Sequence, residues 1–534
     1  MKNLKNFYKL LNNEKYYPFY VLLLSAAVLF FQLDGSIGSW DESIYSEVAK
    51  EGVMGNNWID FFYKGELWFE KPPFVIWLTM ISYKIFGVTE FATWFFPVVF
   101  GIFGVVGIYY LGKYLFNSKT GLLASLILLS IPHYVLMARN NMMDVFLVSN
   151  SVISFLFLIK SRENSKYLIL SAIFLGLAFM SKNIISLLNL PIFFYYLYIS
   201  NQLNIFKSKY FYISIIVFLA IILPWHLIMF LKHGSSFVNN YINYHLIERY
   251  NENVLHMEHT TDVFYYFKII LQRAGSWWFV FLMTLPIILS RIKQKAPEHK
   301  KLLLLILWLV FIFIFFTSSV TKINHYILPI YIPFSLLIAY GLHKYYENKS
   351  VFLLLSILVL FMNVSWTVIL QVSDFGGSRL LFPLILHKLF HLPANVIFLF
   401  ICLLSGYIIY HYFLKSKSLA VNILLSALFI FSFILPFYLD RCPLAKEVGE
   451  LTERSGIETI YFYNYYGHKI SNIKNPLVFY NYPIEITHLE LEDLEQAKFS
   501  KDSSAYCLVN KTDFRNWYRS KGLDYDFYPC EIAK

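Results

Sequence analysis

Long apolar runs recur along most of this 534-residue chain, and they restrict its fold more than any other feature of the sequence. About thirteen are long enough to cross a bilayer, because a spanning helix needs roughly 20 mostly apolar residues. Their approximate limits are 17–33, 91–111, 120–137, 144–160, 167–181, 184–200, 210–231, 276–290, 301–317, 325–342, 351–371, 394–413 and 419–438. Only 15% of the residues are charged, against about 25% in soluble domains. The sequence therefore predicts a mainly α-helical, polytopic membrane protein.

The loops between these runs alternate in charge. Every second loop is basic, and together these loops hold Lys113, Lys119, Lys160, Arg162, Lys166, Lys207, Lys209, Arg291, Lys293, Lys295, Lys300, Lys301, Lys344, Lys349, Lys415 and Lys417. The remaining loops, including 34–90 and 232–275, are acidic or mixed. Because cytoplasmic loops collect Lys and Arg, this alternation predicts a cytoplasmic N-terminus and an extracytoplasmic C-terminal tail. It also explains the net charge of +11 without a nucleic-acid partner.

Two segments differ from the spanning runs. The piece 73–86 is too short to span, and we expect an interfacial or re-entrant helix there. The tail alternates expected strands at 456–466, 475–486 and 504–510 with expected helices at 445–455, 491–499 and 512–522, a pattern typical of a small α/β domain. The predicted domains are therefore 1–438, in the membrane, and 439–534, outside it. Cys442, Cys507 and Cys530 lie in the tail, and their spacing leaves any disulfide pairing open.

Ionisable residues gather in the loops that the charge pattern places outside. The loop 34–90 holds Asp41, Glu42, Glu47, Glu51, Asp60, Glu66 and Glu70, opposed by Lys50, Lys64 and Lys71. Further along lie Arg139, Asp144, Lys182, His245, Arg249, His256, His259, Lys322, His325 and Tyr326. Charged residues beside a bilayer usually serve a function. Carboxylates together with Lys, Arg and His suit a general base next to a bound phosphate, here on a lipid.

Several of these residues also have a simpler structural explanation. Asp41 and Glu42 are suited to cap a helix over 43–51. Lys71 and Lys182 are each placed to extend an ammonium group from an apolar run to the membrane surface. Arg139 and Asp144 are close enough in sequence to be each other's partner. An isolated loop histidine is more often a surface residue than a ligand.

The order of residues in the first long loop resembles that of GT-C glycosyltransferases related to the lipid A aminoarabinose transferases and protein O-mannosyltransferases. The matching positions are Asp41, Glu42, Tyr45, Ala49, Trp58, Gly65, Phe69, Glu70, Lys71, Pro72, Pro73, Trp77 and Leu78. Supporting matches follow at 86–91, Arg139 with Asp144, 176–182, 223–226, 245–250 and 321–333. The chain departs from the aminoarabinose transferases at Ile44, where they typically have Arg, and at 94–97, where they usually have Arg-Leu-Pro.

The resemblance implies transfer of a sugar from a polyprenyl (undecaprenyl) phosphate to an acceptor outside the cytoplasmic membrane, such as lipid A, another envelope glycan or a protein. It implies a catalytic role for Asp41 and Glu42. Substrate binding falls to Tyr45, Glu70, Lys71, Arg139, Asp144, Lys182, His245, Arg249, His259, Lys322, His325 and Tyr326. We assume no metal, although Glu70, His245 and His259 leave a divalent site open. No nucleotide-binding motif occurs in the sequence. The alternative function is a membrane transporter or lipid flippase; charges in external loops and the lack of repeats favour the enzyme.

Overall fold

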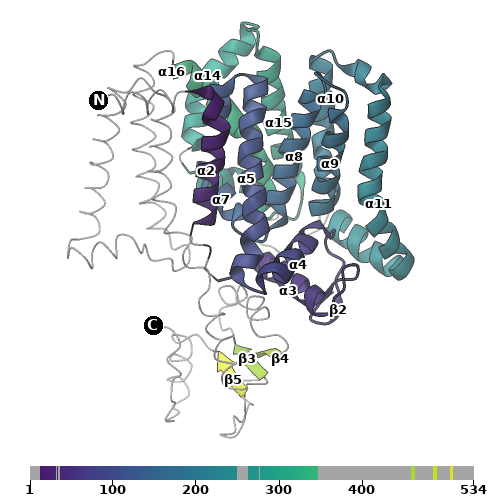
Figure 1. The fold of residues 1–534 in the computed structure, drawn as a ribbon. Coiled ribbons are helices and arrows are strands. Elements are labelled where there is room, and N and C mark those ends of the chain that lie inside the picture. The colour runs from purple at the N-terminus through teal and green to yellow at the C-terminus, as the bar shows by residue number, and fades with distance from the viewer. Residues whose placement is uncertain are drawn as a thin grey trace, which may run out of the picture. The chain divides into compact units, whose positions relative to one another are not determined.

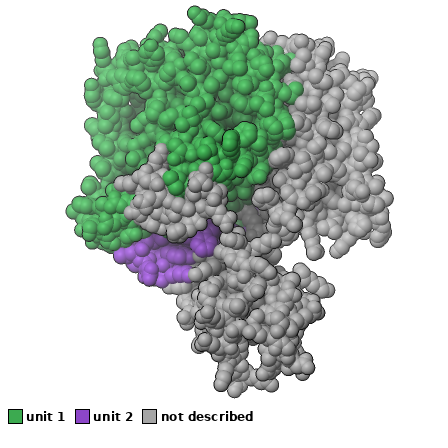
Figure 2. Space-filling model, turned by 180° about the vertical axis from the view of Figure 1, so that it is seen from behind, with its two compact units in different colours: residues 1–31, 69–75, 94–438 green, residues 32–68, 76–93, 439–534 purple. Residues whose placement is uncertain are grey.

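The computed structural model describes residues 13–31, 33, 36–248, 262–275 and 277–346, together with three strands of the tail (Figure 1). The spans expected at 351–371, 394–413 and 419–438 and the helices expected in the tail lie outside the described residues. Backbone contacts divide the chain into two compact units. The first unit comprises Met1–Phe31, Phe69–Val75 and Trp94–Tyr438, and the second comprises Gln32–Trp68, Ile76–Thr93 and Leu439–Lys534 (Figure 2).

The first unit is a bundle of helices. In chain order they are α2 (Tyr17–Phe30), α5 (Glu90–Leu115, which begins in the second unit), α6 (Ser118–Ser130), α7 (Pro132–Ala138), α8 (Met143–Lys160), α9 (Tyr167–Lys182), α10 (Asn189–Ile199), α11 (Lys209–Phe237), α13 (Tyr265–Arg273), α14 (Trp277–Lys293), α15 (His299–Ser318) and α16 (Tyr331–Tyr346). Short 3-10 helices are η1 (Glu14–Tyr16), η2 (Asn183–Leu188), η3 (Leu203–Lys207) and η5 (Asn324–Ile330), and η4 (Val238–Glu248) is a π-helix.

Among the described residues, six helical stretches are long and apolar enough to cross a membrane, or up to eight if each of two bent pairs forms one span. The sequence predicts ten spanning runs over the same part of the chain. Two differences between prediction and structure reduce ten runs to eight spans. Helix α2 has 14 residues, about 21 Å, which is shorter than a usual span. The runs predicted at 167–181 and 184–200 form one helical stretch of 33 residues.

That stretch nevertheless contains a reversal of the chain at Asn183, where φ is +51°. Contacts with α8 show the reversal. Lys182, at the end of α9, pairs with Asp144 at the start of α8. Further along, Asn189 donates a hydrogen bond to Ser151 and the Phe193 ring stacks on Phe155, so these contacts move steadily down α8. After Asn183 the chain therefore runs back along α8, and α9 and α10 are antiparallel legs. The two runs predicted at 167–181 and 184–200 thus correspond to α9 and α10.

One predicted run is bent. The segment expected as a single span over 120–137 forms α6 and α7, which meet at an angle of 73°. Pro132 lies at the first position of α7, where its missing N–H is tolerated, and it disfavours helical geometry at Ile131 before it. The sequence prediction overlooked this break.

The loops predicted to be basic meet at one end of the bundle. Lys301 Nζ donates to the Leu115 carbonyl at 2.5 Å. Lys160 Nζ lies over the rings of Tyr114 and Tyr167. The polar residues at 139–144, 182 and 322–326 gather instead where α8 begins and α9 ends. The alternation read from the sequence thus corresponds to two chemically different ends of the bundle.

The second unit includes α3 (Trp40–Met54), a hairpin of β1 (Phe62–Tyr63) and β2 (Glu66–Leu67), and most of α4 (Phe74–Phe86), whose first two residues belong to the first unit. Lys64 and Gly65 have φ of +56° and +76°, the geometry of a tight two-residue hairpin turn. The Glu51 carboxylate accepts both of their N–H groups, at 2.6 and 3.1 Å, and so ties the turn to α3. Helix α4 has 13 residues, in agreement with the short helix expected over 73–86.

The tail contributes a three-stranded parallel sheet in the order β4 (Glu485–Leu489), β3 (Thr459–Tyr463), β5 (Ala505–Leu508). Strands β3 and β5 lie within the predicted runs 456–466 and 504–510, whereas β4 overlaps only the end of 475–486. Parallel neighbours require crossover connections. A complete α/β domain stays a prediction, because the crossovers lie outside the described residues.

Candidate functional site

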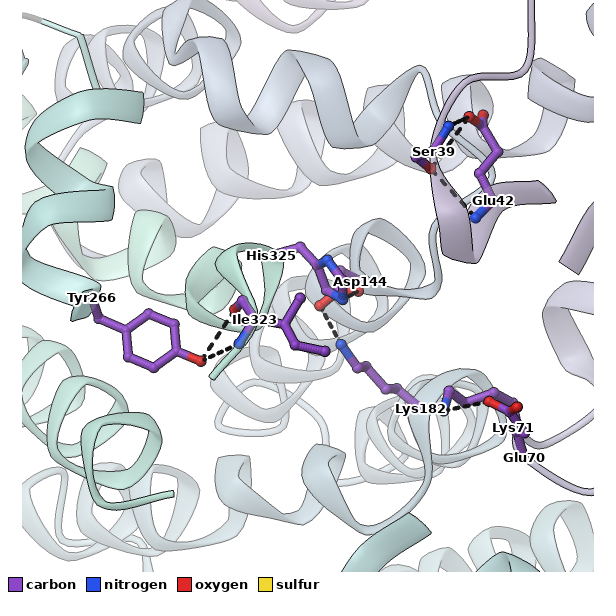
Figure 3. Close-up of polar contacts among 9 residues, drawn as sticks. All are labelled: Ser39, Glu42, Glu70, Lys71, Asp144, Lys182, Tyr266, Ile323 and His325. Carbon is purple, nitrogen blue, oxygen red and sulfur yellow. Dashed lines mark hydrogen bonds and ion pairs between the residues drawn. The ribbon is translucent and has the colours of Figure 1, made fainter. Parts of the chain in front are cut away.

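A buried ion pair lies at the centre of the polar end of the first unit. Lys182 Nζ is 2.5 Å from Asp144 Oδ1, and both side chains are buried. Asp144 lies in the first turn of α8, and Lys182 is the last residue of α9. Each charge therefore lies at the helix end whose dipole favours it. Because the two helices are antiparallel, these ends meet (Figure 3). The simpler explanation, a Lys182 that only extends to the membrane surface, does not account for this pairing.

Three more residues complete the cluster around this pair. His325 Nε2 is 3.8 Å from Asp144 Oδ2. The Lys182 ammonium lies 4.3 Å from the centroid of the Tyr326 ring, within the range of a cation–π contact. Lys71, buried and 3.9 Å from the carboxylate of Glu70, also interacts electrostatically with Asp144. The structure thus brings together five of the predicted residues, with Glu70 beside them.

The segment before His325 is held by a residue that the sequence prediction overlooked. Tyr266 of α13 donates its hydroxyl to the Ile323 carbonyl at 3.1 Å and accepts the Ile323 N–H at 3.3 Å. Lys322 in this segment is buried and donates to the Ser319 carbonyl at 2.7 Å. Burial lowers the pKa of Lys322 from its ordinary value, and Asp262 opposes this effect.

Arg139 has a different role from the one considered with Asp144. It ends α7, and its guanidinium donates to the Phe31 carbonyl at 2.7 Å. Asp144 is paired with Lys182 rather than with Arg139. Arg139 therefore joins α7 to the end of α2 and adds a buried positive charge to this end of the bundle.

His133 is a second residue that the sequence prediction overlooked. It is fully buried on α7, its Nδ1 lies 3.1 Å from the Tyr331 hydroxyl, and it interacts electrostatically with His325 and Arg273. Its only sequence signal is a His beside Pro132 inside an apolar run. The acid–base groups of this end therefore extend deeper into the bundle than the loops indicate.

In the second unit, Glu42 forms part of a helix cap. Ser39 is the N-cap of α3. The Glu42 carboxylate accepts the Ser39 N–H at 3.4 Å, and the Glu42 N–H donates to Ser39 Oγ at 3.4 Å (Figure 3). This is the reciprocal Ser-x-x-Glu capping box. The helix starts at Trp40 rather than at the predicted residue 43. Asp41, in the same turn and half-buried, is not the N-cap.

Tyr45 and Glu47 face the interior of the second unit. The Tyr45 ring is 6.0 Å from that of Trp68, centroid to centroid, and is buried. Glu47 is fully buried and 3.2 Å from Lys50 Nζ. Burial, only partly offset by Lys50, raises the pKa of Glu47 to about 7. Burial also raises the pKa of the nearby Tyr83 phenol.

Other predicted residues are outside what the structure can test. Arg249, His256 and His259 lie outside the described residues, and for His245 only the backbone, in η4, is described. No group of three or more His, Cys, Asp or Glu side chains within the described part of the chain could hold a metal ion. Whether Glu70, His245 and His259 form a divalent site, which the sequence left open, therefore stays open.

Taken together, the polar end of the first unit is rich in buried cations. Lys71, Arg139, Lys182 and Lys322 are buried there, whereas Asp144 is the one buried carboxylate among the site residues described in this unit. Such an arrangement suits an anionic ligand, because these four positive charges outnumber that carboxylate and make the local potential positive. Lysine and arginine are also the usual partners of phosphate oxygens.

Comparison of the whole chain with solved structures gives the fold class. Its fold is that of ArnT from Cupriavidus metallidurans, solved bound to undecaprenyl phosphate, with a TM-score of 0.70 and 17% identity over 89% of this chain and 86% of that one. The chain therefore has the membrane-embedded GT-C fold.

Sequence comparisons are consistent with that fold. A family model described as dolichyl-phosphate-mannose-protein mannosyltransferase matches residues 70–228. An uncharacterized protein of Aquifex aeolicus is 28% identical over 73% of this chain and 78% of its own length. The undecaprenyl phosphate-alpha-4-amino-4-deoxy-L-arabinose arabinosyl transferase of Wigglesworthia glossinidia brevipalpis is 29% identical over 65% of this chain. This match spans only 60% of that relative. The resemblance inferred from the first loop is confirmed.

Proposed function

We propose that this protein is a glycosyltransferase of the cytoplasmic membrane that takes a sugar from an undecaprenyl phosphate carrier. The observation that carries the proposal is the excess of buried cations around Asp144. It is supported by relatives that include proteins named undecaprenyl phosphate-alpha-4-amino-4-deoxy-L-arabinose arabinosyl transferase. The leaving lipid phosphate gains negative charge as the glycosidic bond breaks. Cations fixed in advance in a partly dry site stabilise that charge.

Within this proposal, Lys71 is the first contact of the phosphate. It is buried and follows Glu70, and Pro72 and Pro73 restrict the backbone after it. Lys182 is already paired with Asp144, so it contributes orientation more than free charge. Lys322, whose pKa is lowered by burial, is stabilised as a cation by an approaching phosphate.

Asp41 is proposed as the base that orients or deprotonates the acceptor, which attacks the anomeric carbon from the face opposite the phosphate and inverts the configuration. Glu42, proposed from sequence as its catalytic partner, has a structural role in the helix cap that accounts for its position. The acceptor class is a lipid, a glycan such as that of lipid A, or a protein on the outer face of the membrane.

The test uses purified full-length protein with undecaprenyl phosphate sugars and, separately, nucleotide sugars. We expect transfer or hydrolysis only with the lipid-linked donors. Asp41→Asn should lower turnover by about a hundredfold or more with donor binding retained, whereas Lys71→Ala should weaken donor binding as well. Turnover of a nucleotide sugar without a lipid intermediate contradicts the proposal.

A further inference from the structure

The short turn η5, which carries His325 and Tyr326, begins without a side-chain cap. Ile323 precedes η5 with extended geometry, φ −125° and ψ 139°, and no side chain caps the turn. An isoleucine has no oxygen to offer the first N–H groups of a helix. A short 3-10 turn is also weakly held by its own hydrogen bonds.

The Tyr266 hydroxyl, which comes from α13, binds the backbone at this uncapped start of the turn. It donates to the Ile323 carbonyl and accepts the Ile323 N–H, so that one side chain satisfies both backbone polar groups of one residue (Figure 3). Tyr266 is fully buried on α13, with the Phe316 ring of α15 6.2 Å from its own, centroid to centroid. Its hydroxyl is therefore fixed by packing rather than by solvent.

This contact holds the two residues of η5 that belong to the ion-pair cluster, His325 and Tyr326. Two residues after Ile323, His325 approaches Asp144 at 3.8 Å. Three residues after it, the Tyr326 ring lies beneath the Lys182 ammonium. A shift of the backbone at Ile323 therefore moves both contacts at once.

We infer that Tyr266 is a positioning residue: through Ile323 it fixes His325 and Tyr326 against the Asp144–Lys182 pair and so keeps the cation cluster in its phosphate-binding arrangement. The last part of this inference rests on the proposed function. Nothing in the chemistry requires Tyr266 to touch the substrate. The proposed effect of its hydroxyl passes through the backbone of Ile323.

The test compares wild-type protein with Tyr266→Phe, which keeps the ring and removes only the hydroxyl. The matched control is Tyr345→Phe, because the Tyr345 hydroxyl also donates to a backbone carbonyl, that of Met283 at 2.9 Å, but Tyr345 lies in the last turn of α16, the end away from η5. Three quantities are measured in detergent: the melting temperature, amide hydrogen exchange over residues 319–326, and the Kd of undecaprenyl phosphate.

We expect Tyr266→Phe to speed exchange over 319–326 and to raise the Kd by on the order of fivefold, as for loss of buried hydrogen bonds. Tyr345→Phe should leave both unchanged at a similar melting temperature. A merely structural role lowers the melting temperature without changing the Kd of the folded protein, and that result overturns the inference. Unchanged exchange overturns it as well. Failure of wild-type protein to bind the lipid refutes the proposed function instead, and the exchange comparison still decides whether the contact exists.

Discussion

At the scale of single residues, Asp144 and Lys182 form the buried ion pair at the centre of the candidate site. A buried carboxylate and a buried ammonium each depend on the other, because desolvation penalises a lone buried charge. The contact of Lys182 with Tyr326 and the approach of His325 to Asp144 add to this mutual dependence. The pair therefore ties stability and the proposed donor binding to the same two side chains.

A double-mutant cycle tests this dependence. We expect Asp144→Asn or Lys182→Met alone to destabilise the protein by about 3 kcal/mol or more, because each leaves one buried charge without its partner. The double variant should recover part of the melting temperature but not transfer activity. Thermal unfolding in detergent measures the first effect and donor turnover the second. Purely additive losses would show that the two residues act independently.

Glu47 gives a pH dependence whose sign follows from burial. Its pKa rises from an ordinary value of 4.5 to about 7 in the folded protein, so ionisation disfavours the folded state. Stability is fully present below pH 4.5 and falls as the pH rises through 7, by up to about 3 kcal/mol. Glu47→Gln should therefore stabilise the protein at pH 8 and much less at pH 5. Melting temperatures across this range measure the effect.

The exposed Glu66 in β2 offers the control for this series. Glu66→Gln removes the same charge from a solvated position and should leave the pH profile of the melting temperature unchanged. If the melting temperature of Glu47→Gln changes with pH in parallel with that of wild-type protein, the raised pKa of a buried Glu47 carboxylate is excluded.

At the scale of elements, α5 and α6 approach so closely that their backbones touch. A Cβ at Gly121 meets the Tyr109 carbonyl oxygen at 2.3 Å and the Lys113 nitrogen at 2.9 Å. These are main-chain atoms, which cannot turn aside as a side chain can. Glycine at this position is what lets α6 fold back against α5 directly after Asn117.

Gly121→Ala should consequently separate the two helices and lower the free energy of unfolding by about 1–3 kcal/mol or more. Gly55→Ala is the comparison, because Gly55 is exposed with φ −80° and meets only the Glu51 carbonyl at 3.3 Å. It should be close to neutral. Equal melting temperatures for the two variants contradict the close approach.

The helices could largely be predicted from sequence, because apolar runs and charged loops depend on the bilayer alone. The breaks could not. The bend at Pro132 interrupts a run that hydropathy shows as continuous. The reversal at Asn183 is visible only as Lys182 between two apolar runs, and a lysine there also fits a surface-seeking side chain. Where a run ends depends on local backbone geometry as well as on its length.

The candidate site was predictable as a set of residue types but not as an arrangement. Asp144, Lys182, His325 and Tyr326 were selected for their charge and position in loops, and they meet in the fold. His133 lacked any such signal, because a histidine in an apolar run usually packs in the core. Tyr266 lacked one because it is an uncharged residue of the predicted loop 232–275, which holds several other tyrosines. Glu42 was selected for its charge, whereas the Ser39–Glu42 spacing was a capping box readable from the sequence.

At the scale of the whole molecule, the two ends of the bundle differ in chemistry. The end with Lys160, Arg291 and Lys301 matches the basic loops, and the opposite end carries the ion-pair cluster. From the positive-inside rule we propose that the basic end faces the cytoplasm. The proposed acceptor is extracytoplasmic, so the orientation of the bundle and the function depend on each other.

Reporter fusions test the orientation. Fusions after Asn117 and Ser165 should report the cytoplasm, because both lie in basic loops, and a fusion after Glu450 should report the outside. Enzymatic reporters active in only one compartment provide the measurement. A cytoplasmic signal from the Glu450 fusion reverses the orientation and excludes an extracytoplasmic acceptor.

The ion pair joins the first turn of α8 to the last residue of α9, and His325 reaches it from the beginning of η5. All three groups therefore lie at helix ends, so their relative heights depend on how far each helix extends into the membrane. Membrane-spanning helices adapt to a change in hydrocarbon thickness by tilting, and neighbouring helices of different length tilt by different amounts. We therefore expect the separation of Asp144, Lys182 and His325, and with it donor binding, to change with acyl-chain length in the surrounding bilayer.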